Sequence, residues 1–128
     1  MAFEIPVLVD SKHRAFADLS THQYKFVKLT SNGIELVSAL TDKPFGVLQN
    51  APTAGQAAEV MRLGLTKVIS GGTIAVGAAV GTSAAGLALS KTLGTDITHF
   101  VAGVADEASV INDIFTLGIN CLAPGRAV

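Results

Sequence analysis

Cysteine and charge are both scarce in this chain of 128 residues. It has one cysteine, Cys121, so no disulfide can form within the chain. Only 15% of the residues are charged, and 9 Lys and Arg against 10 Asp and Glu leave a net charge of −1. Without a basic excess, nothing indicates binding to nucleic acid. A surface this poor in charge predicts instead that part of it is covered by another protein.

Targeting and membrane segments are also lacking. The N-terminus, from Met1 to Pro6, has no basic start followed by an apolar run, so we expect no signal peptide. Residues 68–90 carry no charge and are long enough to span a membrane. Their glycines and hydroxyl residues recur at the spacing of turns, and most of their apolar residues are alanine. We therefore expect strands and loops there, and no membrane partner.

What the sequence does contain is a series of short apolar runs separated by turn residues. Asn32-Gly33 lies between two of them and predicts a hairpin. Many short strands at this spacing predict an all-β protein with little helix, in the form of a small β-barrel or sandwich. Residues 54–63 are compatible with a strand or a short helix, and we favour the strand. The runs are residues 23–29, 34–37, 45–49, 57–63, 65–69, 74–80, 87–90, 97–104 and 113–122.

The last run alternates between apolar and polar residues, which is typical of a strand with one buried face. A cysteine inside such a run is expected to be buried and chemically inert. We expect the inward set to be Phe115, Leu117, Ile119 and Cys121, and the outward set to be Thr116 and Asn120.

The chain also contains an internal echo. Residues 27–36 are similar to residues 80–89, with a turn glycine at the same place in both segments. Gly46-Val47 is echoed by Gly103-Val104, and residues 60–64 are echoed by residues 114–118, both ending in Leu-Gly. The constant order predicts two internally similar units of about 54 residues that bury their apolar faces together. The alternative is chance similarity among glycine-rich strands.

Residues 1–20 differ from the rest, and we expect an extended N-terminal arm there, followed by a single β domain over residues 21–128. Alternate residues of an extended segment face the same side, so the arm would present an apolar side followed by cations. Such an arm could dock onto a neighbouring subunit. The alternative is that it completes the sheet of its own domain. The candidate interface residues are Phe3, Ile5, Val7, Val9, Lys12, His13, Arg14 and Phe16.

Motifs for catalysis are not found. The glycines at 72 and 77, and at 81 and 86, have the spacing of a phosphate-binding loop, but the Lys and hydroxyl that must follow are missing from both. The histidines His13, His22 and His99 include no close pair of the kind that binds zinc. We therefore predict no catalytic residues, no metal site and no cofactor, and we do not expect an enzyme.

Four segments carry a resemblance to a known family. They are Tyr-Lys-Phe-Val-Lys-Leu at 24–29, Lys-Pro-Phe-Gly-Val-Leu-Gln-Asn at 43–50, and the stretches 54–64 and 75–82. In these segments the chain resembles the small capsid cement proteins of tailed bacteriophages, also called decoration or head-stabilisation proteins. The likeness extends over the whole chain, and its motifs are structural.

The resemblance implies a compact β domain that binds the outer surface of a capsid lattice in the virion, after synthesis in the host cytoplasm. It implies the major capsid protein as a partner, together with other copies of the chain, often as a trimer, and an arm lying over neighbouring shell subunits. Two alternatives remain open at this point. One is a small ligand-binding β-barrel or enzyme, and the other is a minor head-completion or tail component.

Overall fold

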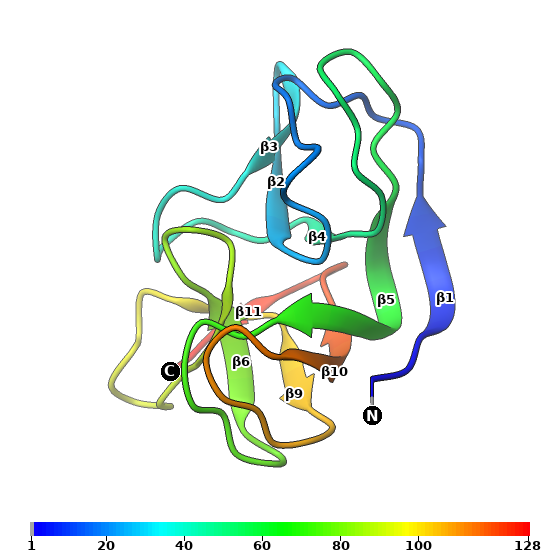
Figure 1. The fold of residues 1–128 in the computed structure, drawn as a ribbon. Coiled ribbons are helices and arrows are strands. Elements are labelled where there is room, and N and C mark those ends of the chain that lie inside the picture. Colours follow the sequence, from blue (N-terminus) through cyan, green and yellow to red (C-terminus); the bar gives the residue numbers. More distant parts are fainter. Residues whose placement is uncertain (1) are drawn as a thin grey trace.

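The computed structural model describes residues 2–128, so Met1, the first residue of the expected arm, lies outside the described residues. Over this range the chain forms strands and no helix, and its main sheet curls into a half-barrel (Figure 1). The predicted all-β fold is therefore confirmed, and no helix in the described range could cross a membrane. The strands are β1 (Ile5–Asp10), β2 (Phe26–Thr30), β3 (Gly33–Leu36), β4 (Gly46–Leu48), β5 (Val60–Ile69), β6 (Ala79–Thr82), β7 (Ala88–Ser90), β8 (Phe100–Val101), β9 (Gly103–Ala105), β10 (Ile114–Asn120) and β11 (Gly125–Arg126).

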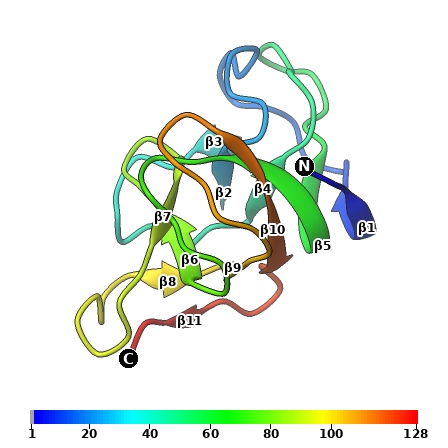
Figure 2. The same cartoon turned by 60° about the horizontal axis from the view of Figure 1, so that its bottom comes forward.

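The topology contains the predicted duplication. Hydrogen-bonded strands follow the path β3-β2-β4-β5-β10-β9-β6-β7. In the internal echo, β2, β3, β4 and β5 correspond to β6, β7, β9 and β10, respectively. The order of equivalent strands is therefore the same when the sheet is followed from either end. The remaining pair, β8 and β11, forms a small separate sheet near the C-terminus (Figure 2). Two similar units thus meet at the β5–β10 ladder.

Glycines at equivalent places explain why the echo includes them. Gly33, the first residue of β3, and Gly86, in the turn between β6 and β7, both have positive φ, at 124° and 79°. Gly46 and Gly103 leave room for the neighbouring strand, since an added Cβ would collide with the carbonyl oxygen of Met61 and of Gly118, respectively. Each pair of glycines therefore has the same structural task in both units.

One part of the predicted equivalence is wrong. The sequence echo aligns Met61 with Phe115, but the ladders align it with Gly118, three residues further on. Val47 pairs with Met61 in the first unit, and its counterpart Val104 pairs with Gly118 in the second. The shared Leu-Gly ending of the two long strands is thus not at equivalent positions, because strand register follows the hydrogen-bonded partners and not a two-residue motif.

The long strand β5 holds the molecule together. Its residue Met61 pairs with β4 and with β1, and Leu65 pairs with β10 and with β1. A strand has only two edges along which other strands can pair. Strands β4 and β10 therefore share one edge of β5, and β1 lies along the other. Between these points Val9 pairs with Met61 and Leu8 with Leu63, which leaves Arg62 as a bulge in β5. Strand β1 therefore runs alongside both the stretch of β5 that pairs with β4 and the stretch that pairs with β10.

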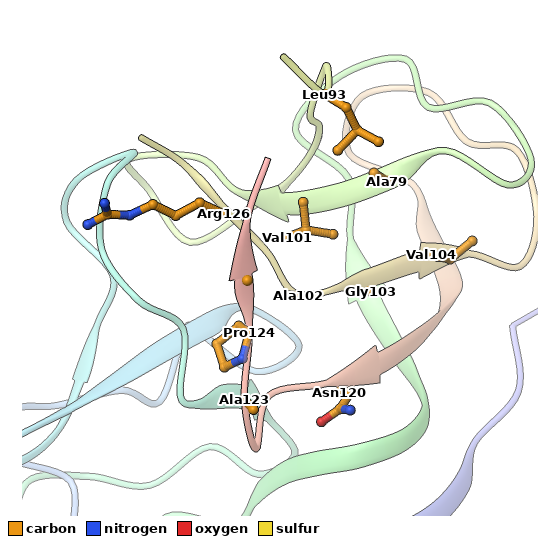
Figure 3. A pocket seen from close by; sticks show the side chains of 11 residues that line it. Ala79, Leu93, Val101, Ala102, Gly103, Val104, Asn120, Ala123, Pro124 and Arg126 are labelled. Atoms are coloured by element: carbon orange, nitrogen blue, oxygen red, sulfur yellow. The ribbon is translucent and has the colours of Figure 1, made fainter. Parts of the chain in front are cut away.

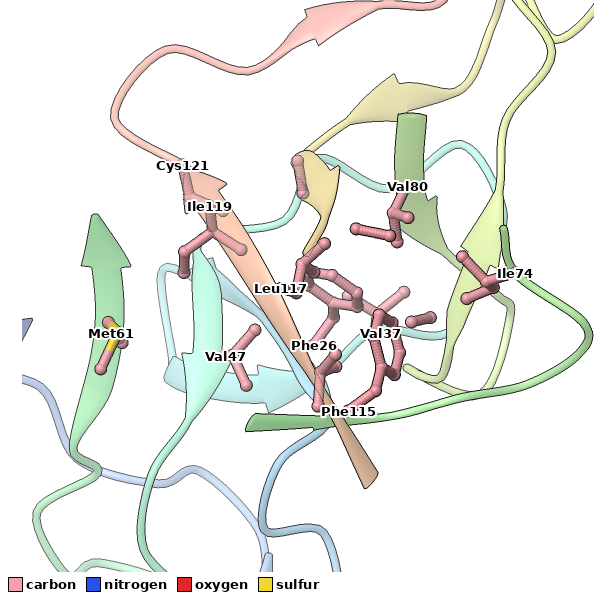
Figure 4. Packing of buried hydrophobic residues seen from close by; sticks show 14 residues of the cluster. Phe26, Val37, Val47, Met61, Ile74, Val80, Phe115, Leu117, Ile119 and Cys121 are labelled. Carbon is pink, nitrogen blue, oxygen red and sulfur yellow. The ribbon is translucent and has the colours of Figure 1, made fainter. Parts of the chain in front are cut away.

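The apolar core has two parts. The larger cluster lies between the two units (Figure 4), and the smaller one lies beneath residues 15–19. The larger consists of Phe26, Val37, Val47, Met61, Val68, Ile74, Val80, Ala88, Ala102, Ala105, Phe115, Leu117, Ile119 and Cys121. The smaller consists of Ala15, Leu19, Val27, Ile34, Leu48, Ala58 and Val60.

The alternation predicted for residues 113–122 is confirmed for the inward set, which is buried in the larger cluster. Asn120 is exposed as expected, but the outward placement of Thr116 is wrong, because Thr116 is fully buried. Its hydroxyl accepts a hydrogen bond from the backbone N–H of Phe3, at 2.7 Å. The N-terminal segment thus covers the outer face of β10 at this point. Residues 54–59 form turns and irregular chain, and β5 begins at Val60 without a preceding helix.

Candidate docking surface

The candidate surface is built on β1, which is extended because its β-branched residues favour strands and Pro6 keeps the preceding residue extended. β1 pairs with β5 in an antiparallel ladder with register shifts around Leu8. Two contacts near its start add to the ladder. The Phe3 N–H bonds to Thr116, and the Glu4 carboxylate lies 3.6 Å from the Lys67 ammonium.

The side chains of β1 are exposed although most of them are apolar. Five consecutive residues from Ile5 to Val9 are exposed, and Val7 is 68% exposed. Successive side chains of a strand point to opposite faces, so neither face of β1 is covered by the chain itself. Figure 1 shows β1 at the rim of the molecule. A contiguous apolar surface on an edge strand is unusual in a protein that acts alone.

The exposed edge of β1 is poorly suited to adding a further strand. Within residues 2–128 the only strand that pairs with β1 is β5. Pro6 lacks an N–H, and the ladder is irregular between Pro6 and Val9. Both features interrupt the hydrogen-bonding pattern that a second strand would need. Contact with a partner would therefore use the side chains of β1 and not its backbone.

The structure divides the predicted interface residues between two places. Phe3, Ile5, Val7 and Val9 lie on or beside β1 and are exposed. Leu8 is also 41% exposed although alternation places it on the opposite side, because the chain covers neither face of β1.

The remaining predicted residues lie in the turn after β1, which is tied to the body of the molecule. Lys12 and Arg14 are exposed, and the Arg14 carbonyl accepts a hydrogen bond from the Ile34 N–H at 2.9 Å. His13 is half-buried, and its ring meets the Phe45 ring edge-on at 5.7 Å between centroids.

Phe16 completes this second group. Its side chain is 53% exposed, while its N–H donates to the carbonyl of Ile34 at 2.9 Å. The neighbouring Ala15 is buried in the smaller core cluster, as is Leu19. The backbone of residues 14–19 is thus fixed by the first unit, and Phe16 is a large apolar group displayed from a rigid segment.

A surface hollow of about 380 Å³ lies at the other end of the molecule (Figure 3). Its lining is mostly aliphatic, from Ala79, Leu93 and the β9 region, with Asn120 and Arg126 as the polar side chains. The Arg126 guanidinium stacks on Phe100, 5.5 Å from the ring centroid. Among residues 2–128 no three His, Cys, Asp or Glu side chains gather in a way that could hold a metal ion.

Two buried side chains, Cys121 and Lys91, carry groups that can be reactive in other proteins. Burial raises the pKa of the Cys121 thiol to about 12, against a smaller opposing effect of Arg62, so the thiol stays protonated at neutral pH. Burial also lowers the pKa of Lys91, whose Nζ donates to the Thr82 carbonyl at 2.8 Å and lies 3.2 Å from His99 Nδ1. The expected burial of Cys121 is confirmed.

Comparison with known proteins finds similarity to a solved structure. No family model matches the chain, and no curated protein matches it. Its structure is similar to a solved structure described as the head fiber gp8.5 N base in bacteriophage phi29, with a TM-score of 0.65 and 24% sequence identity. The match covers 89% of this chain and 96% of that chain. At this identity the likeness establishes a shared fold.

Proposed function

We propose that this chain is a structural protein of a bacteriophage virion that binds the outer surface of the head and stabilises the capsid lattice. The observation that carries the proposal is the exposed apolar surface of β1, which the fold leaves uncovered on both faces. The shared fold with the base of a phage head fiber supports a location on the head. The proposed activity is binding, with no catalytic step.

The proposed partner is the major capsid protein, contacted by residues 1–20. In this proposal the apolar residues of β1 and Phe16 are removed from water on the shell, at roughly 25 cal/mol per Å² before ordering costs. Lys12, His13 and Arg14 lie at the rim and pair with shell carboxylates. Each contact can be modest, because a lattice displays many identical sites.

Further copies of the chain are the second proposed partner, and a trimer is the assembly that the cement resemblance implies. Exposed apolar residues around the hollow at the β9 end, including Leu93 and Val104, offer a surface for such contacts. Analytical ultracentrifugation of the purified chain tests this part, since a single species with the mass of a monomer at high concentration would contradict it.

Sedimentation with phage heads that lack this protein tests the main proposal. We expect the wild-type chain to saturate the heads at a copy number comparable with that of the shell protein and to raise their melting temperature. A few copies per head would instead indicate a minor head-completion component.

The variant Val7→Asp should weaken this binding at least about tenfold, because an unpaired carboxylate would be buried at the contact. Val76→Asp is a matched control, since Val76 is also 68% exposed and lies outside the N-terminal segment. Equal binding by both variants and the wild type would exclude β1 from the contact.

A further inference from the structure

A small basic pocket lies where the two units meet, and its central residue is Arg62. Arg62 lies at the bulge in β5, and its side chain reaches the residue just before β4 and the residue just after β10. Its Nε donates to the Phe45 carbonyl and its Nη2 donates to the Cys121 carbonyl, both at 3.1 Å. The guanidinium also stacks on the Phe45 ring, 3.8 Å from the centroid. The position of this cation is thus fixed from three sides.

The charge of Arg62 is not neutralised by the chain. Its hydrogen-bond acceptors are neutral carbonyls, and no carboxylate of residues 2–128 forms an ion pair with it. A guanidinium has five N–H groups, of which these bonds use two, so three remain. The pocket has a volume of about 220 Å³, and its lining contains a second cation and no acidic residue. It is lined by Leu29, Lys43, Pro44, Phe45, Arg62, Cys121 and Leu122.

The second unit shows that the fold does not require a cation at this position. The ladders that align Met61 with Gly118 also align Arg62 with Ile119, which is buried in the core. They align Phe45, the stacking partner of Arg62, with Ala102. An apolar side chain therefore suits the equivalent position. Holding a charged group there in the first unit, half-buried and without an anion, costs desolvation, and hydrogen bonds to a bound anion would offset this cost.

We infer that this pocket binds the carboxylate of an Asp or Glu side chain of the protein on which the chain docks. The planar guanidinium matches a carboxylate, and the Lys43 ammonium adds a second positive charge. Leu29, Phe45 and Leu122 form apolar walls suited to the methylene groups of an acidic side chain. The small volume and the net charge of −1 favour a single carboxylate over a nucleic-acid backbone.

The pocket is continuous with the proposed docking surface through one aromatic ring. Phe45 has Arg62 against its face and also makes a T-shaped ring contact with the predicted interface residue His13. The inference rests on the proposed function for the identity of the partner, but not for the preference for carboxylates. The two can therefore be tested separately.

The first test is binding to heads by charge-reversed variants. Lys43 is exposed and does not belong to the core, so Lys43→Glu should fold normally. We expect Lys43→Glu to weaken binding at least about tenfold, as expected for losing a charge-assisted contact. Val76→Asp is the control, because it adds a negative charge at an exposed residue outside both proposed contact surfaces. Unchanged binding by Lys43→Glu, or equal loss in both variants, would overturn the assignment of a partner carboxylate.

The second test uses the free chain and does not depend on heads. Glutarate, a dicarboxylate with a short apolar stem, is titrated against a chloride control at equal ionic strength while NMR follows the Nε–Hε signals of Arg62 and Arg126. We expect a saturable shift of the Arg62 signal alone, and a weaker effect with phosphate. No saturable shift, or tighter binding of phosphate, would contradict the carboxylate site. If glutarate binds but the wild-type chain does not bind heads, the proposed function fails and the carboxylate site stands.

Discussion

β1 and β10 flank the same stretch of β5 from opposite edges, yet the fold uses them differently. Every second side chain of β10 from Phe115 to Ile119 is buried in the core between the units. β1 has a similarly apolar composition, but its residues from Ile5 to Val9 are all exposed. The apolar side chains of β10 are accounted for by the stability of the domain, whereas those of β1 are not. That difference is the physical basis for assigning β1 to contacts with another protein.

The largest effect that separates the two strands is expected from truncating a core side chain. Leu117 is fully buried, so Leu117→Ala should lower the free energy of unfolding by about 2–5 kcal/mol. Val7→Ala on β1 should change it by less than about 0.5 kcal/mol, because Val7 is mostly exposed. Urea denaturation of both variants measures the contrast, and similar losses would show that β1 is part of the core.

A second variant tests the end of β10. Cys121→Ser should cost about 1–3 kcal/mol, because a hydroxyl is poorly matched to the buried site of the thiol. The raised pKa of Cys121 also predicts a pH dependence of stability. Above about pH 9 the thiol loses its proton in the unfolded chain but keeps it in the folded chain, so the free energy of unfolding falls as pH rises. Labelling of the native protein by a thiol reagent at pH 8 should be slow and should accelerate in urea. Rapid labelling of the folded chain would show that the site is open.

A small effect is also expected at the attachment of β1. The Glu4–Lys67 ion pair is partly exposed, with side-chain exposures near one third on both partners. Exposed pairs contribute little, so Glu4→Gln should lower stability by less than about 1 kcal/mol. The effect should disappear in high salt, because exposed charges are screened there. A larger, salt-independent loss would indicate that β1 is anchored by more than its backbone ladder.

Sequence reasoning predicted the elements whose own residues encode them. The turn glycines Gly33 and Gly86, the hairpins they close and the inward face of β10 all follow from local pattern. The sequence echo aligns Met61 with Phe115, whereas the ladders align it with Gly118. This difference of three residues could not be predicted, because strand register is decided by neighbours that are distant in sequence. The outward placement predicted for Thr116 was wrong for the same reason, since the N-terminal segment, which is distant in sequence, covers this residue.

The candidate surface was predictable only in part. The apolar residues of β1 stand out by composition, but Leu8 joins them because no other part of the chain covers the second face of β1, which no local motif indicates. Arg62 gave no signal in the sequence, since a single Arg in a strand is usually solvated. Its role emerges only when Phe45 and the Cys121 carbonyl are placed around it.

Hydroxyl-radical footprinting of the chain, free and bound to saturated phage heads, tests the central claim most directly. It reports the exposure of each side chain and so compares the two states without any mutation. We expect the exposed Val76 to keep its labelling on binding, while most labelling is lost from Phe3, Ile5, Val7, Leu8 and Val9. If β1 remains labelled at its free rate on heads that are fully occupied, its apolar surface is not the docking surface.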